Sequence, residues 1–276
     1  MASDLTQRDS MGRVCGGNLR DRLDRLTGLL CDHVENLVLL DVVDSTHAMA
    51  RRLIASMDEE ELSLGATVII AGHQEKGEGR GDRQWASPTG GLYASWMQSG
   101  IDSETVARLP MLAAAATLSA VNSIGVLDAR IKWPNDILVG GRKLAGMVVF
   151  ARHGEAIWAT VGLGINIDTT PVLDGSNGVQ ATSVAELLQA GNPDDWRDTL
   201  ITAYLRNLTQ SLTDPEPALA TWRRHLIQKP GDIVTVRLAS AAEVTGILLA
   251  VSDEGFLKID VNGDERVISG GDLIES

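Results

Sequence analysis

The sequence predicts an α+β fold followed by a small β-barrel, and two observations support this prediction. Between residues 37 and 227, short β-rich apolar runs alternate with longer amphipathic segments, as strands and helices do around a shared core. After Pro230 and Gly231 only short strands with turns remain, which is typical of an SH3-like barrel. We therefore expect a leader with one amphipathic helix over 1–36, a main domain over 37–228 and an SH3-like domain over 229–276.

Composition and charge exclude several kinds of partner. Hydrophobic residues make up 44% of the 276-residue chain and charged residues 22%, which is ordinary for a globular protein with a sizeable core. The formal net charge is -13. Non-specific binding to nucleic acid or to anionic membrane surfaces needs clustered cations, so this charge argues against DNA and membrane partners.

The sequence indicates a cytoplasmic protein. Its two cysteines, Cys15 and Cys31, offer neither a disulfide framework nor the spacing of zinc ligands, which suggests a reducing compartment. No apolar run reaches the roughly 18 residues that a membrane helix needs. Residues 1–10 also lack the apolar run of a signal peptide.

The N-terminal elements are predicted from periodicity and caps. Leucines at helical spacing predict an amphipathic helix near the start, and continuous apolar runs predict buried strands. Ser45 and Thr46 follow the first strand and are good N-caps for the helix after it. His47 is expected on the surface of that helix. Helices are expected over 18–30 and 47–56, and strands over 37–43, 67–71 and 91–98.

The remaining elements include one long helix over 104–124, in which Pro110 predicts a separate or kinked first turn. Gly140 and Gly141 predict a two-residue hairpin turn, because paired glycines supply the positive φ angles it needs. The pair Asn262-Gly263 is a second hairpin signal. Further helices are expected over 182–190, 193–211 and 217–227, and further strands over 137–139, 143–150, 156–167, 233–236, 244–251, 256–261 and 266–268.

Polar residues gather around the first of these turns in an otherwise apolar stretch. Pro134 prevents a central strand from continuing, so Asn135 and Asp136 are expected at the mouth of a strand, with Lys132 just before them. The turn then returns Lys143 toward them. Polar groups that converge over an apolar floor are typical of small-ligand sites, although a surface hairpin with solvated charges has the same spacing.

A glycine-rich loop over 72–85 is a candidate phosphate site. Glycines let backbone N–H groups approach an anion, and Arg80 and Arg83 add charge-assisted hydrogen bonds. A flexible surface loop would have a similar composition. The loop alone therefore leaves both interpretations open.

Two glycines, Gly162 and Gly164, precede Asn166 at the end of a predicted strand. Without side chains there, a ligand could lie against the backbone, although glycines in a strand also mark β-bulges. An amide at this strand end favours the ligand interpretation.

Several segments resemble the biotin protein ligase family. Its central signature is similar to Lys-Trp-Pro-Asn-Asp (132–136) followed by Arg-Lys-Leu-Ala-Gly (142–146), and 91–95, 162–166 and the loop before Trp85 resemble further family segments. The resemblance implies a mixed, mostly antiparallel sheet flanked by helices, of the class II synthetase-like type, with an SH3-like C-terminal barrel. We expect the form without an N-terminal DNA-binding domain, which would need on the order of 60 residues.

The resemblance implies a ligase that acts in two steps. Biotin attacks the α-phosphate of Mg-ATP to give biotinyl-5′-AMP and pyrophosphate, and a lysine of a carboxylase carrier domain then displaces AMP. Fixed cations must lie between the two reacting anions, and a loop must cover the water-labile adenylate. Biotin, ATP with Mg²⁺, and the biotin carboxyl-carrier domain are the implied partners of a monomer or homodimer.

The same resemblance implies the site residues. Biotin contacts are expected from Ser45, Thr46, Gln74, Gly77 and Lys143. Adenylate contacts are expected from Arg80, Arg83, Trp85, Lys132, Asn135 and Asn166. The expected catalytic residues are Lys143, Arg80 and Asp136. Asp136 is expected to act on the acceptor amine or to hold Mg²⁺, and both roles stay open.

One position departs from the family pattern. Glu78 stands where the family has an arginine, and a carboxylate there would repel a phosphate unless Lys76 or Arg83 neutralises it. No aromatic residue between positions 168 and 195 offers a cover for the adenine, so the aliphatic Val179 is the expected cover.

Three alternatives belong to other functional classes. A lipoate or octanoate ligase or transferase would use a related fold on a different acid. A biotin-responsive DNA-binding repressor is disfavoured by the acidic charge. A biotin-binding regulator with little transfer activity is kept open by Glu78.

Overall fold

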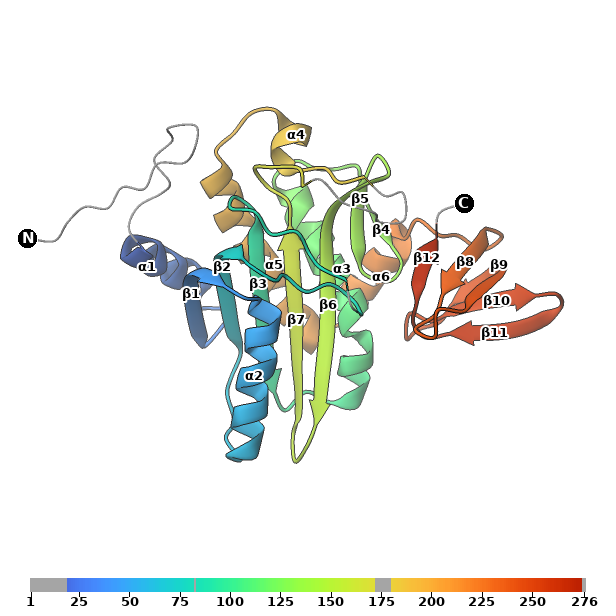
Figure 1. Cartoon of the computed structure of the whole chain (residues 1–276), viewed down its shortest axis with the longest axis horizontal. Helices are drawn as coiled ribbons and strands as arrows, with labels where there is room; N and C mark the ends of the chain where they lie inside the picture. Colours follow the sequence, from blue (N-terminus) through green and yellow to red (C-terminus); the bar gives the residue numbers. More distant parts are fainter. Residues whose placement is uncertain (1–18, 82, 172–179, 275–276) are drawn as a thin grey trace, which may run out of the picture.

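The computed structural model describes residues 19–81, 83–171 and 180–274. Its centre is a seven-stranded sheet in the order β1-β2-β3-β7-β6-β5-β4 (Figure 1). The strands are β1 (Asn36–Val43), β2 (Thr67–Gln74), β3 (Leu92–Ser99), β4 (Ala129–Lys132), β5 (Asp136–Val139), β6 (Arg142–His153) and β7 (Ile157–Ile165). Among them β1 and β2 pair in parallel and every other pair is antiparallel, so the predicted mixed, mostly antiparallel sheet is confirmed.

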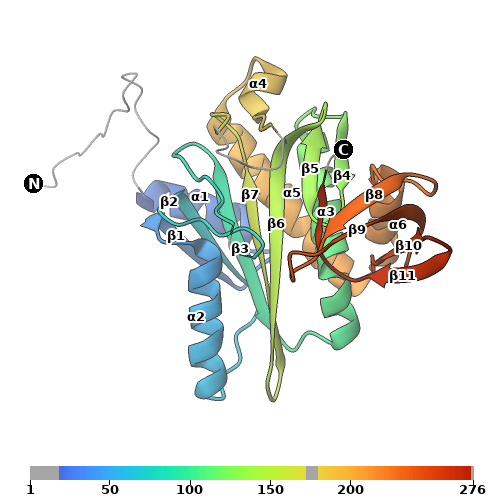
Figure 2. The same cartoon turned by 45° about the vertical axis from the view of Figure 1, so that its right-hand side comes forward.

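Helices cover both faces of this sheet (Figure 1 and Figure 2). Strand residues point alternately to opposite faces. On β2, Ile69 packs with Ile54 of α2 (Thr46–Glu59), whereas Val68 and Ile70 belong to the larger core. That core also holds residues of α1 (Leu19–Leu30), α3 (Ser103–Ser123), α5 (Pro193–Thr213) and α6 (Glu216–His225). The face of the sheet that carries α2 therefore stays partly open for a site.

The long helix α3 continues through Pro110, so a separate first turn is not present. Proline removes one hydrogen bond and crowds the preceding turn. The side chains of Leu109 and Met111, on either side of the proline, are only 0% and 3% exposed to solvent. The free energy gained by burying this apolar face outweighs the free energy lost at the proline. The helix is thus held by packing against the sheet.

A second, five-stranded sheet in the order β11-β10-β9-β8-β12 follows near the C-terminal end. Its strands are β8 (Ile233–Arg237), β9 (Glu243–Val251), β10 (Leu257–Val261), β11 (Asp264–Ile268) and β12 (Asp272–Ile274). The pairs are antiparallel, and Asn262 and Gly263 form the predicted turn with positive φ angles. This sheet fits the expected barrel-like domain, whereas the exact domain boundaries stay a prediction.

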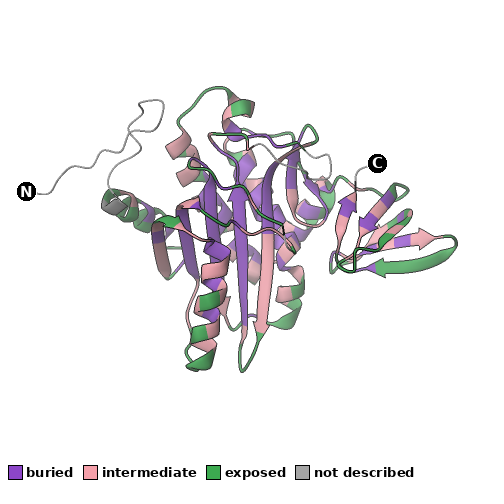
Figure 3. Ribbon diagram, viewed as in Figure 1, coloured by how far each residue is buried: buried purple, intermediate pink, exposed green. Residues whose placement is uncertain are grey.

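The two sheets touch near the polar stretch that the sequence singled out. Nε1 of Trp133 donates a 2.7 Å hydrogen bond to the carbonyl of Gly255, which joins the start of β5 to the small sheet. Figure 3 shows the central strands of the large sheet buried along much of their length, whereas β11 is largely exposed. No helix in the described residues is long and apolar enough to span a membrane.

The sequence did not predict two short strands, β4 and β12. Each is an edge strand of three or four residues, too short for a periodic signal. The strand predicted over 67–71 continues to Gln74, so the first residues of the predicted loop, 72–74, belong to β2. Both differences bear on the site, because β12 and the end of β2 contribute residues to it.

Candidate active site

A cavity of about 760 Å³ lies on the α2 side of the large sheet. Its walls are the first turn of α2, the loop of residues 75–91 between β2 and β3, the hairpin of β5 and β6, and one end of the small sheet. We call this loop the strap. Eleven of the twelve predicted site residues line the cavity: Ser45, Thr46, Gln74, Arg80, Arg83, Trp85, Lys132, Asn135, Asp136, Lys143 and Asn166. The twelfth, Gly77, belongs to the strap itself and lies next to Gln74 and Ser87.

The cavity is cationic although the chain is acidic. Its lining contains five cationic side chains and three carboxylates, namely Arg80, Arg83, Lys132, Lys143 and Arg237 against Glu78, Asp136 and Asp272. The whole chain carries a net charge of -13. A concentration of positive charge in a low-dielectric cleft attracts anionic ligands.

The floor of the cavity is a row of glycines. Gly146 of β6 pairs directly with Gly164 of β7, and Asp136 of β5 pairs with Gly146 in turn. A Cβ atom on Gly164 would lie 2.5 Å from Nε1 of Trp85, and one on Gly146 would lie 2.9 Å from Cζ3 of the same indole. The indole therefore rests on bare backbone, and its buried Nε1 has no hydrogen-bond partner among the described residues.

The side chain of Lys143 reaches the same place. Its Nζ lies 2.8 Å from Oδ1 of Asp136 and 5.2 Å from the centroid of the Trp85 ring. The pairing of β5 with β6 shifts between Ile137 and Leu138. Such a bulge re-aims a neighbouring side chain. Near the start of β6, the side chain of Lys143 therefore lies beside the carboxylate of Asp136 on β5.

A chain of hydrogen bonds connects α2, β2 and the strap. The backbone N–H and the hydroxyl of Thr46 both donate to Oε1 of Gln74, at 2.8 and 3.1 Å. Nε2 of Gln74 donates to the hydroxyl of Ser87, which donates to the carbonyl of Trp85. Ser45 instead caps α2 by accepting from the N–H of Ala48. The two predicted N-caps thus divide between a helix cap and a pocket contact.

The prediction that His47 lies on the helix surface is wrong. The side chain is 5% exposed, lines the cavity and packs against Gly162. Burial, with a smaller contribution from the charge of Arg51, lowers the pKa of His47 from 6.5 to about 4. The strand β7 has no side chain at Gly162, which leaves room for the imidazole.

This buried imidazole predicts a pH-dependent stability. His47 is neutral in the folded chain down to about pH 4, whereas the unfolded chain takes up the proton near pH 6.5. Stability is therefore lost as the pH falls between these values, by about 3 kcal/mol in total. We expect the free energy of unfolding of His47→Gln to fall less steeply over this range than that of the unchanged protein, as measured by urea denaturation at several pH values. Parallel curves would contradict this expectation.

Both strap arginines bind the small sheet. Nη2 of Arg83 lies 2.8 Å from Oδ1 of Asp272, and Nη1 of Arg80 donates to the carbonyl of Gly271 at 3.0 Å. Arg80 also lies 3.4 Å from Asp272 and from Oδ1 of Asn135. The sequence offered no signal for Asp272, because it lies almost 190 residues from its partners and in a strand that was not predicted.

The predicted adenylate amides are engaged with backbone. Nδ2 of Asn166 donates to the carbonyls of Thr182 and Lys143, at 3.0 and 3.3 Å, and Asn135 donates to the carbonyl of Met147. Asn166 thus steadies the backbone that carries the lysine. Lys132 is 8% exposed and lines the cavity. The expected adenine cover, Val179, lies outside the described residues.

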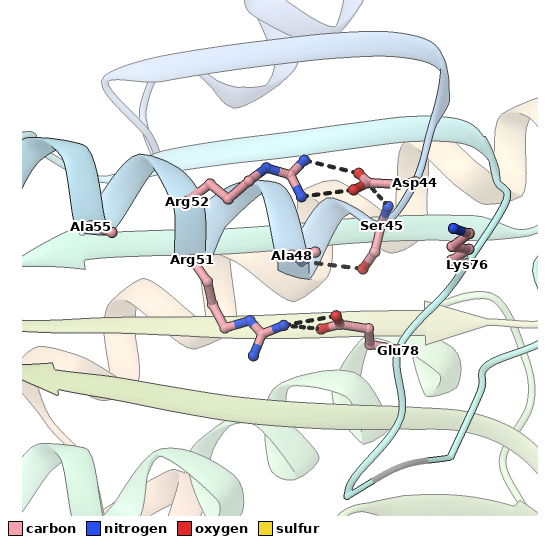
Figure 4. A pocket seen from close by; sticks show the side chains of 8 residues that line it. All are labelled: Asp44, Ser45, Ala48, Arg51, Arg52, Ala55, Lys76 and Glu78. Carbon is pink, nitrogen blue, oxygen red and sulfur yellow. Dashed lines mark hydrogen bonds and ion pairs between the residues drawn. The ribbon is translucent and has the colours of Figure 1, made fainter.

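Glu78 is neutralised by a residue that the sequence did not single out. Its two carboxylate oxygens accept hydrogen bonds of 2.7 and 2.8 Å from Nη2 of Arg51 on α2 (Figure 4). Neither of the two cations considered from the sequence does so, because Lys76 is exposed and Arg83 is bound to Asp272. The signal available was the spacing of four residues between His47 and Arg51, which puts both side chains on the same face of α2.

The described residues contain no group of three His, Cys, Asp or Glu side chains that could hold a metal ion. Asp136 is the carboxylate beside the lysine, and its Oδ1 is paired with Nζ. One carboxylate is a donor set that suits Mg²⁺ carried in by nucleotide phosphates, because this ion commonly takes one or two carboxylates and completes its shell with phosphates and water.

Comparisons with known proteins agree with this fold and identify its family. Residues 39–168 match the model of the Biotin/lipoate A/B protein ligase family. The chain is 30% identical over 244 residues to the biotin--[acetyl-CoA-carboxylase] ligase of Mycobacterium tuberculosis, with 85% of this chain and 88% of that protein covered. It is 28% identical to the bifunctional ligase/repressor BirA of Escherichia coli, with 86% and 73% covered. A biotin protein ligase from Aquifex aeolicus, solved with biotin and ATP, has the same fold at a TM-score of 0.66, 24% identity and coverage of 87% and 97%. The chain belongs to the biotin protein ligase family.

Proposed function

We propose that this protein activates biotin with ATP to form biotinyl-5′-AMP and then transfers the biotinyl group to a lysine of a carboxylase carrier domain. The observation that carries the proposal is the cationic cavity over a glycine floor, in a chain that is otherwise strongly acidic. Family membership supports the same reaction. The enzyme class is that of a biotin–protein ligase.

In the first step the residues of the cavity offset the repulsion between two anions. The biotin carboxylate and the α-phosphate both carry negative charge, so a fixed cation between them lowers the energy of the transition state. We assign this role to Lys143, with Arg80 and Arg83 on the nucleotide side. Mg²⁺, when bound with ATP, neutralises phosphate charge, and Asp136 is the carboxylate that we expect to contact it.

The biotin end of the cavity is assigned to the hydrogen-bonded chain of Ser45, Thr46 and Gln74. A ureido ring both donates and accepts hydrogen bonds, and hydroxyl and amide groups match it. Adenylate contacts are assigned to Trp85, Lys132, Asn135 and Asn166. Gly77, within the strap, supports this end by leaving room for Gln74 and Ser87.

The second step requires a neutral amine, because an ordinary lysine is protonated at neutral pH. Asp136 is the carboxylate that can orient the incoming amine or accept its proton once Lys143 has turned to the ligand. The strap excludes water from the mixed anhydride while the acceptor approaches. We place the reaction in the cytoplasm, where biotin, ATP and carrier domains are available in a reducing environment.

The test is biotin transfer to a purified biotin carboxyl-carrier domain in the presence of Mg-ATP, followed by intact-mass spectrometry. We expect one biotinyl group on the acceptor lysine and none when ATP is omitted or when that lysine is replaced by arginine. Absence of transfer with biotin would contradict the proposal.

A lipoate or octanoate ligase is the second candidate, because the matching family model covers both biotin and lipoate ligases. The same assay with lipoate and octanoate in place of biotin separates the two candidates. Transfer of lipoyl or octanoyl groups without biotinyl transfer would favour the second one.

A further inference from the structure

Within the strap, residues 77–79 and 83–85 pair with each other as two antiparallel arms over the cavity. The N–H of Gly79 donates to the carbonyl of Arg83 at 2.8 Å, and the N–H of Trp85 donates to the carbonyl of Gly77 at 2.8 Å. Glu78 and Gln84 form an antiparallel bridge between these bonds. These contacts hold the two arms together, and Trp85 at the end of one arm places its indole on the glycine floor.

Ion pairs attach the strap to two different parts of the molecule. Arg80 and Arg83 bind Asp272 on the small sheet. Glu78 binds Arg51 on α2, at the other side of the cavity. A strap attached at only one of these places could pivot about the remaining contact.

The second attachment has the geometry of a specific contact. Both oxygens of Glu78 accept from the same guanidinium nitrogen of Arg51, while the guanidinium carbon lies 5.8 Å from the centroid of the Phe150 ring on β6. The two charged side chains are 40% and 34% exposed, so water screens them only in part. The aromatic ring limits the positions open to the guanidinium, which makes the pair more selective than an ordinary surface pair.

We propose that the pair of Arg51 and Glu78 is a latch that positions the strap over the adenylate. This proposal rests on the proposed function, and it gives a positioning role to Glu78, which stands where the family has an arginine. The latch has a second effect, since Arg51 neutralises a carboxylate that lines the cavity and would otherwise repel the phosphate. Arg51 and Glu78 are positioning residues and take no part in bond making.

The two effects predict an asymmetric set of variants. Glu78→Gln breaks the latch and also removes the negative charge. Arg51→Gln breaks the latch and leaves the carboxylate unpaired beside the phosphate, so we expect its defect to be larger. Because both changes break the same contact, the double variant should be no worse than Arg51→Gln alone. The exchanged pair, Arg51→Glu with Glu78→Arg, should restore the latch.

The experiment measures adenylate escape as steady-state pyrophosphate release with biotin and Mg-ATP but no acceptor. The unchanged protein should give a burst of about one pyrophosphate per site, followed by slow release. Both single variants should keep the burst and raise the slow rate, by roughly two- to fivefold, which is the range for losing a partly exposed charged pair. The exchanged pair should return within about twofold of the unchanged protein.

Arg52→Gln is the matched control. Arg52 follows Arg51 on α2 and makes a similar two-oxygen contact with Asp44, at 2.7 and 3.0 Å, and no hydrogen bond joins it to the described residues of the strap (Figure 4). It should leave the slow rate unchanged. Equal escape from Arg52→Gln and Arg51→Gln would overturn the latch, and so would tighter retention in Glu78→Arg alone, because that variant faces Arg51 with a second cation.

Limited trypsin digestion of the ligand-free protein tests the latch independently of the reaction. Cleavage after Arg80 and Arg83, followed by mass spectrometry, should be faster in both single variants and should return to the original rate in the exchanged pair. Unchanged cleavage in the single variants would overturn the latch whatever the assays show. A missing burst in the unchanged protein, with altered cleavage in the variants, would instead contradict the proposed function and leave the latch supported.

Discussion

Replacement of Lys143 by alanine is expected to slow biotinyl-5′-AMP formation by about 10²- to 10³-fold, the range seen when one preorganised electrostatic contact to a transition state is lost. The ammonium group lies 2.8 Å from Asp136 and over the Trp85 ring, at the point where the cavity brings its cations together. Removing it leaves the carboxylate of Asp136 facing two further anions, the biotin carboxylate and the α-phosphate. The measurement is the single-turnover rate of pyrophosphate release with biotin and Mg-ATP.

Two further variants make this result specific. Lys143→Arg keeps the charge but changes its shape and reach, so only part of the activity should return. Lys229→Ala removes an exposed lysine that does not line the cavity and should behave like the unchanged protein. A Lys143→Ala protein that keeps its rate of adenylate formation would contradict the assignment of this lysine to the first step.

A valine at Gly164 is expected to reduce biotin transfer by at least about 100-fold, although the strand itself should still form. The β-branched residue suits a strand, but its Cβ would lie 2.5 Å from Nε1 of Trp85. The indole must then leave the glycine floor, and the strap that carries it must rise from the cavity. Transition-state contacts that depend on a closed strap are lost together, which explains the size of the effect.

The measurement for Gly164→Val is kcat/KM for biotin transfer, together with the thermal unfolding midpoint. The matched control is Gly28→Ala in α1, where an added Cβ meets no atom within 4 Å. It should leave transfer unchanged, and as a glycine replacement within a helix it should not lower the midpoint. Normal transfer by Gly164→Val would show that contact between the indole and the glycine row is not needed for the reaction.

Much of the local structure could be read from the sequence because its causes lie within a few residues. Gly140 and Gly141 take φ angles of 56° and 75°, which is what a paired-glycine turn requires. Ser45 caps α2 through its own hydroxyl, three residues before the N–H that it accepts from. The α+β fold with a mostly antiparallel sheet is also confirmed, but the antiparallel pairing was implied by the family resemblance rather than by periodicity.

The order of strands could not be read from local pattern. β7 inserts between β3 and β6 through pairs such as Tyr93 with Gly164 and Gly146 with Gly164. Every one of these strands is an apolar run, so the sequence alone permits several neighbours for each. The choice among them depends on how the whole core packs, and that energy is spread over many contacts.

The predicted site residues converge on one cavity, but their assigned roles stay predictions. The motifs that carried the family resemblance supplied Lys143, Asp136 and the strap arginines without any knowledge of their distances. The sequence did not identify Arg51, Asp272 or the burial of His47. Each of these three features depends on a segment that is distant in the sequence. Arg51 contacts the strap, and Asp272 contacts the strap arginines. His47 packs against the backbone at Gly162, which carries no side chain.

By itself, the sequence determined the local elements, the glycine turns and the set of polar residues that the family motifs hold. Only the tertiary structure decided that Glu78 faces Arg51 rather than Lys76, and that the strap reaches Asp272 on the small sheet. The physical reason is the separation along the chain over which each effect acts. Backbone preferences are set by a residue and its near neighbours, whereas an ion pair forms only where the packing of two distant segments brings opposite charges within hydrogen-bonding distance.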